Sequence, residues 1–163
     1  MNIFILDKDP RLAAQYHNDK HCIKMILESV QMLCNAITIF GTPNSLTYKL
    51  THLKHPCSLW VCESLENWLW LYRLTKFLNI EYKYRYNKTE DHKSFLVLQS
   101  QKCLILKSKI PNIKMTPFKM AMPIDYQNKN VVDSYRTYYR KDKLTWGNNK
   151  PSTWTKRGKP YWL

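Results

Sequence analysis

The sequence predicts a mainly α fold in which two long helices pack against each other in one compact domain. Residues 10 to about 40 lie between helix start and stop signals and are apolar around most of the helix circumference. A second segment, from Pro56 to about Tyr82 or one turn further, has equally broad apolar coverage. Such helices must be packed on several sides, so each should be the other's main partner. The 163 residues, 44% of them hydrophobic, suit a single domain with a buried core, which we expect to span residues 1–163.

A short extended segment, residues 2 to 6, should lead into the first helix and pack on the core. Asp9 and Pro10 form the helix start, because the Asp side chain accepts a first-turn N–H and proline at the first helical position loses no hydrogen bond. Residues 41–43, Gly-Thr-Pro, form the stop. We therefore predict one uninterrupted helix from residue 10 to about residue 40.

Beyond the two long helices, the sequence predicts two shorter helices, a proline-broken loop and an irregular tail. The shorter helices run from Ser94 to about Lys107 and from about Asn130 to Lys143. The loop between them contains prolines 111, 117 and 123, which a helix cannot traverse. The tail, residues 145–163, should wrap back onto the body of the protein through its tryptophans.

The polar residues of the first helix follow one narrow stripe. At roughly 100° per residue the stripe is about 100° wide, and it contains His17, His21, Lys24, Glu28, Gln31 and Asn35. It faces either a strip of solvent or the inside of a cleft. Imidazoles, an ammonium and a carboxylate this close together are the side chains of acid–base and phosphate chemistry, which favours the cleft.

The net charge of +14 is concentrated in the second half of the chain. Residues 1–81 hold 8 Lys and Arg against 7 Asp and Glu, whereas residues 82–163 hold 18 against 5. Such a balance is typical of nucleic-acid binders, although membranes and small polyphosphates also attract basic surfaces. Aromatic residues interleaved with the cations favour nucleic acid, because bases stack on rings while Lys and Arg hold phosphates. Tyrosines at helical spacing usually pack in cores, so about half of these rings should be structural.

Several classes of function are excluded or disfavoured by what the sequence lacks. Three glycines in total exclude a Gly-rich phosphate loop, and neither an HExxH motif nor a CxxC pair is present. Five cysteines without paired spacing favour buried thiols in a reducing compartment over a disulfide framework. There is no signal peptide and no stretch of 18 or more apolar residues, so we expect a soluble protein in the cytoplasm without a membrane partner.

A metal site is one alternative use of the histidines. His17 and His21, four residues apart, could share an ion with His52, His55 or Cys57. The flanking Lys20 and Lys24 would hold that cation in a positive field, and no carboxylate-rich set compensates for it. We therefore expect neither a metal nor another cofactor.

Organic catalysis accounts better for the residues Lys20, His21, Lys24 and Glu28. A lysine whose pKa is lowered by neighbouring positive charge can act as an amine nucleophile, and a nearby carboxylate can stabilise a cationic sugar or move a proton. His55 and Glu63 are expected to line the opposite wall of this site. Lys24 and Glu28 at this spacing can equally form a simple helix salt bridge, and the sequence leaves both readings open.

Several segments of the chain carry family resemblances. The segment Leu12-Ala13-Ala14-Gln15-Tyr16-His17, a second helix introduced by a histidine loop, and the ending Ser152-Thr153-Trp154-Thr155-Lys156 with Gly158-Lys159 resemble the small all-helical pyrimidine-dimer DNA glycosylases of phages, the endonuclease V type. The segments Asp19-Lys20-His21, His55-Pro56-Cys57, Thr116-Pro117-Phe118 and Tyr135-Arg136-Thr137-Tyr138-Tyr139 resemble a set of uncharacterised phage and viral proteins over nearly the full length.

The glycosylase resemblance implies a terminal amine as nucleophile and a glutamate on the first helix. Those enzymes use the amine of a small second residue, freed by removal of methionine, whereas position two here is Asn2, which normally leaves Met1 in place. At the level of the family's glutamate stand Cys22 and Ile23, and Glu28 lies more than a turn beyond. The sequence therefore predicts that the nucleophile has moved or that the lyase step is lost.

Our leading hypothesis is a viral DNA glycosylase-like enzyme, located in the infected cell, that acts on a damaged or modified base. An enzyme of this kind extracts its base from the stack, which suits the surplus of aromatic rings. The residues expected to contact nucleic acid, DNA rather than RNA, or a nucleotide are His17, Asn67, Tyr84, Arg85, Tyr86, His92, Lys93, Arg136, Tyr139, Lys143, Trp154 and Lys156. The alternative is a binding protein without catalysis, which packages nucleic acid or sequesters a small nucleotide in a closed pocket.

Overall fold

Helices dominate the structure, a computed structural model that describes residues 1–106 and 108–163 without the side chains of residues 102, 103 and 106. The helices are α1 (Pro10–Tyr16), α2 (Asp19–Phe40), α3 (Pro56–Glu63), α4 (Leu65–Tyr86), α5 (Lys93–Leu106) and α6 (Val131–Asp142). The single-turn 3-10 helices η1 (Ile124–Tyr126) and η2 (Gly147–Asn149) and an antiparallel pair of strands, β1 (Thr145–Trp146) and β2 (Lys150–Pro151), complete the fold. The predicted mainly α class is confirmed. Lys107, the predicted end of the third helix, lies outside the described residues.

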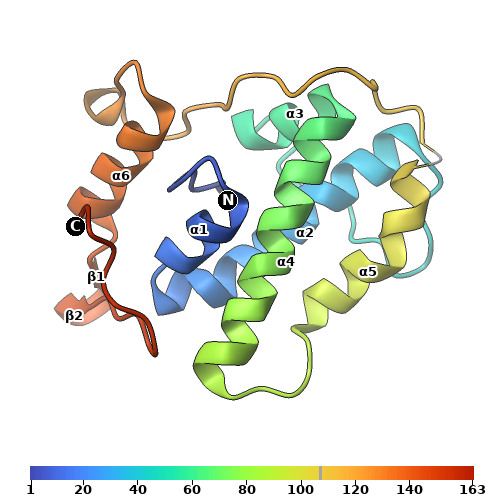
Figure 1. Ribbon diagram of the computed structural model, residues 1–163. Coiled ribbons are helices and arrows are strands. Elements are labelled where there is room, and N and C mark those ends of the chain that lie inside the picture. Colours follow the sequence, from blue (N-terminus) through green and yellow to red (C-terminus); the bar gives the residue numbers. More distant parts are fainter. Residues whose placement is uncertain (107) are drawn as a thin grey trace.

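Helices α2 and α4 form the centre of the molecule, as predicted for the two long helices (Figure 1). Helix α4 also packs on α1, and α5 packs along α2. The loop after α5 crosses the molecule to η1 and α6, which lie on the far side of the N-terminal segment (Figure 1). The start of the chain is thus enclosed by the first helices and the last one.

The prediction of one helix over residues 10–40 is wrong, because His17 and Asn18 interrupt it. Both residues have extended backbone conformations. The Asn18 side chain accepts a hydrogen bond from the His21 N–H at 2.9 Å, so it caps the start of α2. The polar stripe therefore begins on one helix and continues on another.

Residues distant in sequence stabilise the end of α1. Arg85 donates to the carbonyls of Gln15 and His17, both at 2.8 Å, and the Trp154 indole N–H donates to the carbonyl of Tyr16 at 2.9 Å. These are carbonyls that a continuing helix would have bonded. Because the nearest of these donors is 68 positions away, helical periodicity cannot reveal the break.

The predicted second long helix is also two helices, which meet at Ser64. Ser64 is extended, and its hydroxyl accepts a hydrogen bond from the Asn67 N–H at 3.1 Å, which starts α4. The Leu65 N–H donates to the carbonyl of Pro111 at 2.8 Å, so the later loop occupies the position where the first helix would have continued. The loop was predicted, but its capping role was not.

The two ends of the chain agree with the sequence in outline. Residues 3 to 6 are buried, as expected, but they form no strand, and the Leu6 N–H donates to the Phe4 carbonyl at 3.0 Å in a tight turn. The tail wraps back as predicted, with Trp154 only 6% exposed. The β1–β2 hairpin within the tail was not predicted. It turns through Asn148 and Asn149, whose φ values of 61° and 55° lie in the left-handed region that asparagine tolerates better than most residues.

Helix α2 is long and apolar enough, by length and composition, to cross a membrane. In the fold, 56% of its most apolar window is buried against other parts of the protein. Core helices of soluble proteins meet the same criterion, so this property is weak evidence for a membrane protein and is compatible with a soluble one.

Loss of the Arg85 guanidinium should be strongly destabilising. The side chain is fully buried and also pairs with Glu81 at 3.0 Å and Asp19 at 3.2 Å. We expect Arg85→Met to lower the free energy of unfolding by about 3–5 kcal/mol, because buried carboxylates and carbonyls lose their partner. Arg73→Met, at an exposed position of the same helix, should change it by less than about 0.5 kcal/mol. Urea denaturation measures both, and equal effects would contradict the role of Arg85.

Candidate active site

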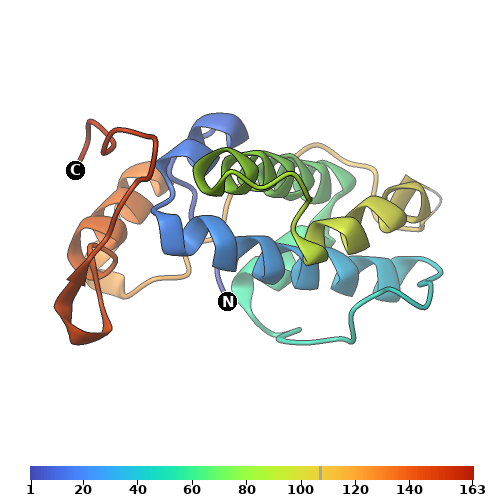
Figure 2. The same cartoon turned by 90° about the horizontal axis from the view of Figure 1, so that it is seen from below.

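A pocket of about 160 Å³ lies between the start of the chain, α2, α6 and the β1–β2 hairpin. Three members of the predicted polar stripe, His21, Lys24 and Glu28, contribute to its wall. Figure 2 shows the N-terminus and the hairpin on one face of the molecule and the C-terminus on the other. The complete lining is Met1, Asn2, Phe4, His21, Lys24, Met25, Glu28, Tyr138, Lys143 and Trp146.

The amine of Met1 and the carboxylate of Glu28 form an ion pair in this pocket. The amine nitrogen lies 3.5 Å from Glu28 Oε2, which also accepts the Asn2 N–H at 3.0 Å. The other carboxylate oxygen lies 3.4 Å from the Lys24 ammonium. The Glu28 side chain is 13% exposed and that of Lys24 is 56% exposed, so the carboxylate is sheltered while the lysine projects into solvent.

Asn2 holds the beginning of the chain in place. Its side-chain amide donates to the carbonyl of Ala121 at 2.7 Å, and its side-chain oxygen accepts the Ile3 N–H at 2.8 Å. The Cys57 thiol donates to the same oxygen at 3.4 Å. Asn2 is only 8% exposed. A residue that looked unsuited to the glycosylase resemblance therefore anchors the Met1 amine beside Glu28.

His21 is a neutral imidazole held in one orientation. Its ring stacks on Phe4 with centroids 4.5 Å apart, and its Nδ1 lies 2.8 Å from the Tyr139 hydroxyl. Burial first, and then His17 and the nearby lysines, lower the pKa of His21 to about 2. His21 therefore has no charge at neutral pH.

His17 is also neutral and lies inside the protein rather than on a binding face. It is completely buried, and its Nδ1 lies 2.7 Å from the carbonyl of Ala13. Burial lowers its pKa to about 4. The idea that charged imidazoles activate Lys20 or Lys24 therefore fails, because both imidazoles are uncharged at neutral pH.

Two half-buried aromatic rings with lysines beside them form part of the pocket wall. The Lys20 ammonium lies 4.2 Å from the centroid of the Trp146 ring, and the Lys143 ammonium lies 4.5 Å from that of Tyr138. Trp146 also meets His21 edge to face, with centroids 5.0 Å apart. The wall thus combines stacking surface with positive charge, the two features that bind nucleotides.

His55 lies close enough to the pocket for the charges of Met1 and Glu28 to act on its own imidazole. It caps the start of α3, where Nδ1 accepts the Cys57 N–H at 3.2 Å. Its pKa is lowered by burial first and then by the Met1 amine, while Glu28 opposes the shift. Of the residues predicted to be catalytic, Lys20, His21, Lys24 and Glu28 are brought together, and His55 is near them.

Glu63 and Asn67 lie together around Thr116 and do not line this pocket. Both bind Thr116 of the long loop: its hydroxyl donates to Glu63 at 2.5 Å, and its N–H donates to the Asn67 side-chain oxygen at 2.9 Å. Lys119 completes the cluster with an ion pair to Glu63 at 3.0 Å. This arrangement fixes the Thr-Pro-Phe segment to α3 and α4, which corrects the placement of Glu63 on the wall of the site.

Several residues predicted to bind nucleic acid make contacts within the fold. Arg136 is 13% exposed at its side chain, where it pairs with Asp7 and donates to the carbonyl of Leu6. Trp154 and Arg85 bind backbone carbonyls around the end of α1. Other predicted binding residues that serve the interior or cap a helix are His17, Asn67, Tyr86, Tyr139 and Lys156.

The remaining predicted binding residues lie away from the pocket. Tyr84 is half exposed and packs beside Lys156 and Arg157. His92 and Lys93 line a wide, open depression where α4 meets α5. Only Lys143 of the predicted binding set lines the pocket that holds the Met1 amine.

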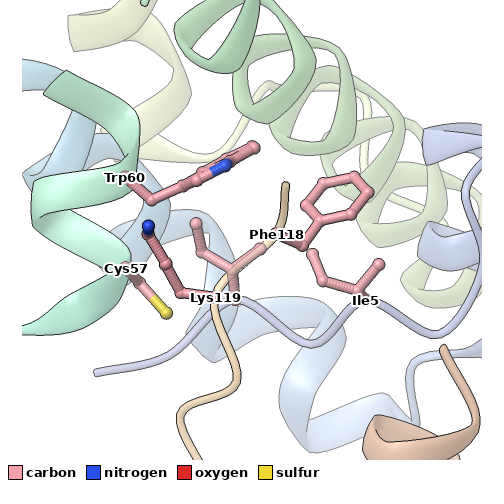
Figure 3. Close-up of a pocket in the computed structure, with 6 residues that line it drawn as sticks. Ile5, Cys57, Trp60, Phe118 and Lys119 are labelled. Carbon is pink, nitrogen blue, oxygen red and sulfur yellow. The ribbon is translucent and has the colours of Figure 1, made fainter. Parts of the chain in front are cut away.

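Another hollow of the described residues is closed to water. Figure 3 shows a crevice between Ile5, Cys57, Trp60, Phe118 and Lys119, which has no volume open to water. Burial raises the pKa of Cys57 to about 11 and that of Cys22 to about 12, so these thiols are protonated and inert. The described cysteines are unpaired, and the side chain of Cys103 lies outside the described residues. Among the side chains that the structure describes, there is no cluster of three or more groups able to hold a metal.

Sequence reasoning missed six residues of the pocket: Met1, Asn2, Phe4, Met25, Tyr138 and Trp146. The resemblance to glycosylases was the one signal that pointed to the start of the chain, although it indicated a different level of the helix. Tyr138 and Trp146 were noted only as part of aromatic-rich segments. No family model, curated protein or solved structure matches the chain.

The buried His17 should make stability depend on pH. Its pKa is about 4 in the folded protein and about 6.5 when unfolded, so unfolding takes up a proton between these values. The free energy of unfolding should therefore fall as pH decreases from 6.5 to 4, by up to about 1.4 kcal/mol per pH unit for this group. Urea denaturation at several pH values should give a shallower slope for His17→Gln than for His52→Gln, an exposed control. Equal slopes would contradict the assignment.

Proposed function

We propose that the protein is a DNA glycosylase-like enzyme that acts on a damaged or modified base and can cleave the resulting abasic site as a lyase. The observation that supports this most directly is the ion pair between the Met1 amine and Glu28 in a polar pocket. The resemblance to pyrimidine-dimer glycosylases implies the same two groups, a terminal amine and a glutamate of the first long helical segment. Two independent arguments therefore favour one chemistry.

The Met1 amine is better suited than a lysine to attack a sugar. The Met1 amine is held within the pocket against a sheltered carboxylate, and amines can form imines with sugar aldehydes. Lys20 and Lys24, which the sequence favoured, are exposed to solvent. Glu28 is sheltered and touches the amine, and it can accept the proton that the nitrogen loses when it bonds to carbon.

The departures from the glycosylase pattern fit this assignment. Position two is Asn2 and not the small residue that supplies the amine in those glycosylases. The buried Asn2 side chain instead holds Met1 at the site. Glu28 lies further along α2 than expected, and the first residues reach it. Relative to the glycosylase pattern, the nucleophile then lies at Met1 in place of residue 2, and the carboxylate lies at Glu28 in place of the level of Cys22 and Ile23.

DNA is the proposed partner. Exposed lysines surround the pocket, and Tyr138 and Trp146 offer rings to an extruded base. The net charge of +14 would attract the polymer from a distance. We place the protein in the cytoplasm of a host cell, where viral DNA is accessible.

The size of this pocket suits part of a polymer better than a whole small nucleotide. Pockets for small organic ligands are usually about 300–1,000 Å³, whereas this pocket is about 160 Å³. It can take one ring or sugar of a larger substrate more readily than a whole nucleotide. A polymer presents one such group at a time.

Borohydride should trap the protein on DNA that contains an abasic site, because the imine between amine and sugar is reducible. We expect Glu28→Gln to slow trapping by about a hundredfold or more, as is typical of a lost acid–base group. Lys24→Ala should change it by no more than about fivefold, because an exposed ion pair is worth at most ~1 kcal/mol.

Peptide mapping of the trapped adduct should locate the DNA on Met1. The intact mass of the protein shows whether Met1 is present and therefore which residue carries the terminal amine. Attachment to Lys20 or Lys24 would contradict the assignment of the nucleophile. No adduct on abasic or lesion-bearing DNA would contradict the lyase mechanism itself.

Binding to DNA should weaken steeply with salt, because the lysines release counterions from the phosphates they replace. Titration of labelled duplex DNA at roughly 50 and 200 mM salt should show about a thousandfold loss of affinity if six or more phosphates are contacted. Lys24→Ala should retain most of this binding. Undetectable binding at the lower salt would contradict DNA as the partner.

A further inference from the structure

The hydrogen bonds around Tyr139 determine which nitrogen of His21 carries the proton. The Asn18 backbone N–H donates to the Tyr139 oxygen at 3.0 Å, so the tyrosine proton is directed elsewhere. The partner at 2.8 Å is His21 Nδ1. Tyr139 is fully buried and has no exposure to water that could replace this arrangement. Nδ1 is therefore an acceptor, and the single proton of the neutral ring is on Nε2.

The Nε2–H of His21 is available to a ligand. It makes no hydrogen bond within the described residues, and His21 lines the pocket that holds the Met1 amine. Phe4 stacks on the ring at 4.5 Å and Trp146 meets it edge to face at 5.0 Å, so the ring cannot turn without disturbing both. The pocket thus contains a rigid, uncharged donor a short distance from the nucleophile.

We propose that His21 activates the leaving base by donating Nε2–H to an uncharged acceptor beside the glycosidic bond, and that Tyr139 is the positioning residue that fixes this tautomer. The inference rests on the proposed glycosylase function and assigns a step that the amine and Glu28 do not perform. Suitable acceptors are O2 of a pyrimidine or N3 of a purine. The pocket of about 160 Å³ favours the single ring of a pyrimidine.

The proposed step balances as follows. The amine nitrogen forms a bond to C1′ while the bond between C1′ and the base nitrogen breaks, and its electron pair remains on the base. The developing negative charge spreads to the acceptor that faces His21, where the N–H stabilises it. The nitrogen gives its surplus proton to Glu28, and the released base takes up a proton from water.

The charges around His21 favour a neutral donor over an acid. Lys20, Lys24 and Lys143 all act on the ring, as does His17 between α1 and α2, and each disfavours a second proton. Phe4 and Tyr139 exclude water from the opposite side. Because the pKa of His21 is about 2, its role as a donor should not change between pH 5 and pH 8.

Two measurements on the full-length protein test the inference. NMR correlation of the ring nitrogens should show His21 of the wild type with a protonated Nε2 and a bare Nδ1, and Tyr139→Phe should populate the other tautomer. Release of bases from ultraviolet-irradiated duplex DNA should fall about a hundredfold in Tyr139→Phe and in His21→Leu, because a donor to the developing charge is lost. His21→Gln, whose amide can still donate, should retain more activity than His21→Leu.

Trapping on DNA with a preformed abasic site separates this role from a structural one, because no base leaves in that reaction. The variants should trap at nearly the wild-type rate. Equal loss of trapping and base release would overturn the inference, as would an Nδ1-protonated or charged His21 in the wild type. Trapping by the wild type without any base release would also overturn it while preserving the lyase function. Failure of the wild type to trap at all would instead count against the proposed function.

Discussion

The buried guanidinium of Arg85 is the interaction on which the rest of the structure depends. It donates hydrogen bonds to two carboxylates and two backbone carbonyls, and the carbonyl contacts end α1 after two turns. An arginine is suited to this because its planar fork directs several donors at once. Had the helix continued through His17, the side chains that follow would be rotated away from the start of the chain.

The break that Arg85 stabilises places Asn18 at the junction of three elements. Its side chain caps α2 and donates to the carbonyl of Lys143 at 3.0 Å and to Ser152 at 3.1 Å. Its backbone N–H binds Tyr139 of α6. One residue thus positions the start of α2, the base of the hairpin and the last helix, which together form three sides of the pocket. The site is a consequence of the interruption rather than of a continuous amphipathic helix.

The fold was largely predictable, because periodicity and helix-end signals are local properties. The packing of two long helical segments, the last helix and the proline-broken loop all followed from residues near one another in sequence. The breaks at Asn18 and Ser64 did not, since their partners Arg85 and Pro111 lie far along the chain. The site was predictable only in part for the same reason. His21, Lys24 and Glu28 share a helix face, whereas the approach of Met1 to Glu28 depends on how the first segment of the chain crosses the helix.

The excess of positive charge in the second half does not by itself locate the pocket. Arg85, Arg136 and Arg157 form ion pairs with carboxylates within the fold, so these three guanidinium groups serve to stabilise the structure. Two of the three lysines around the pocket, Lys20 and Lys24, belong to the first half, whose charges nearly balance. A charge count by segment therefore indicates how strongly the protein attracts an anion but not where the anion is held. The position of the site is set by the few cations that remain exposed beside a sheltered carboxylate.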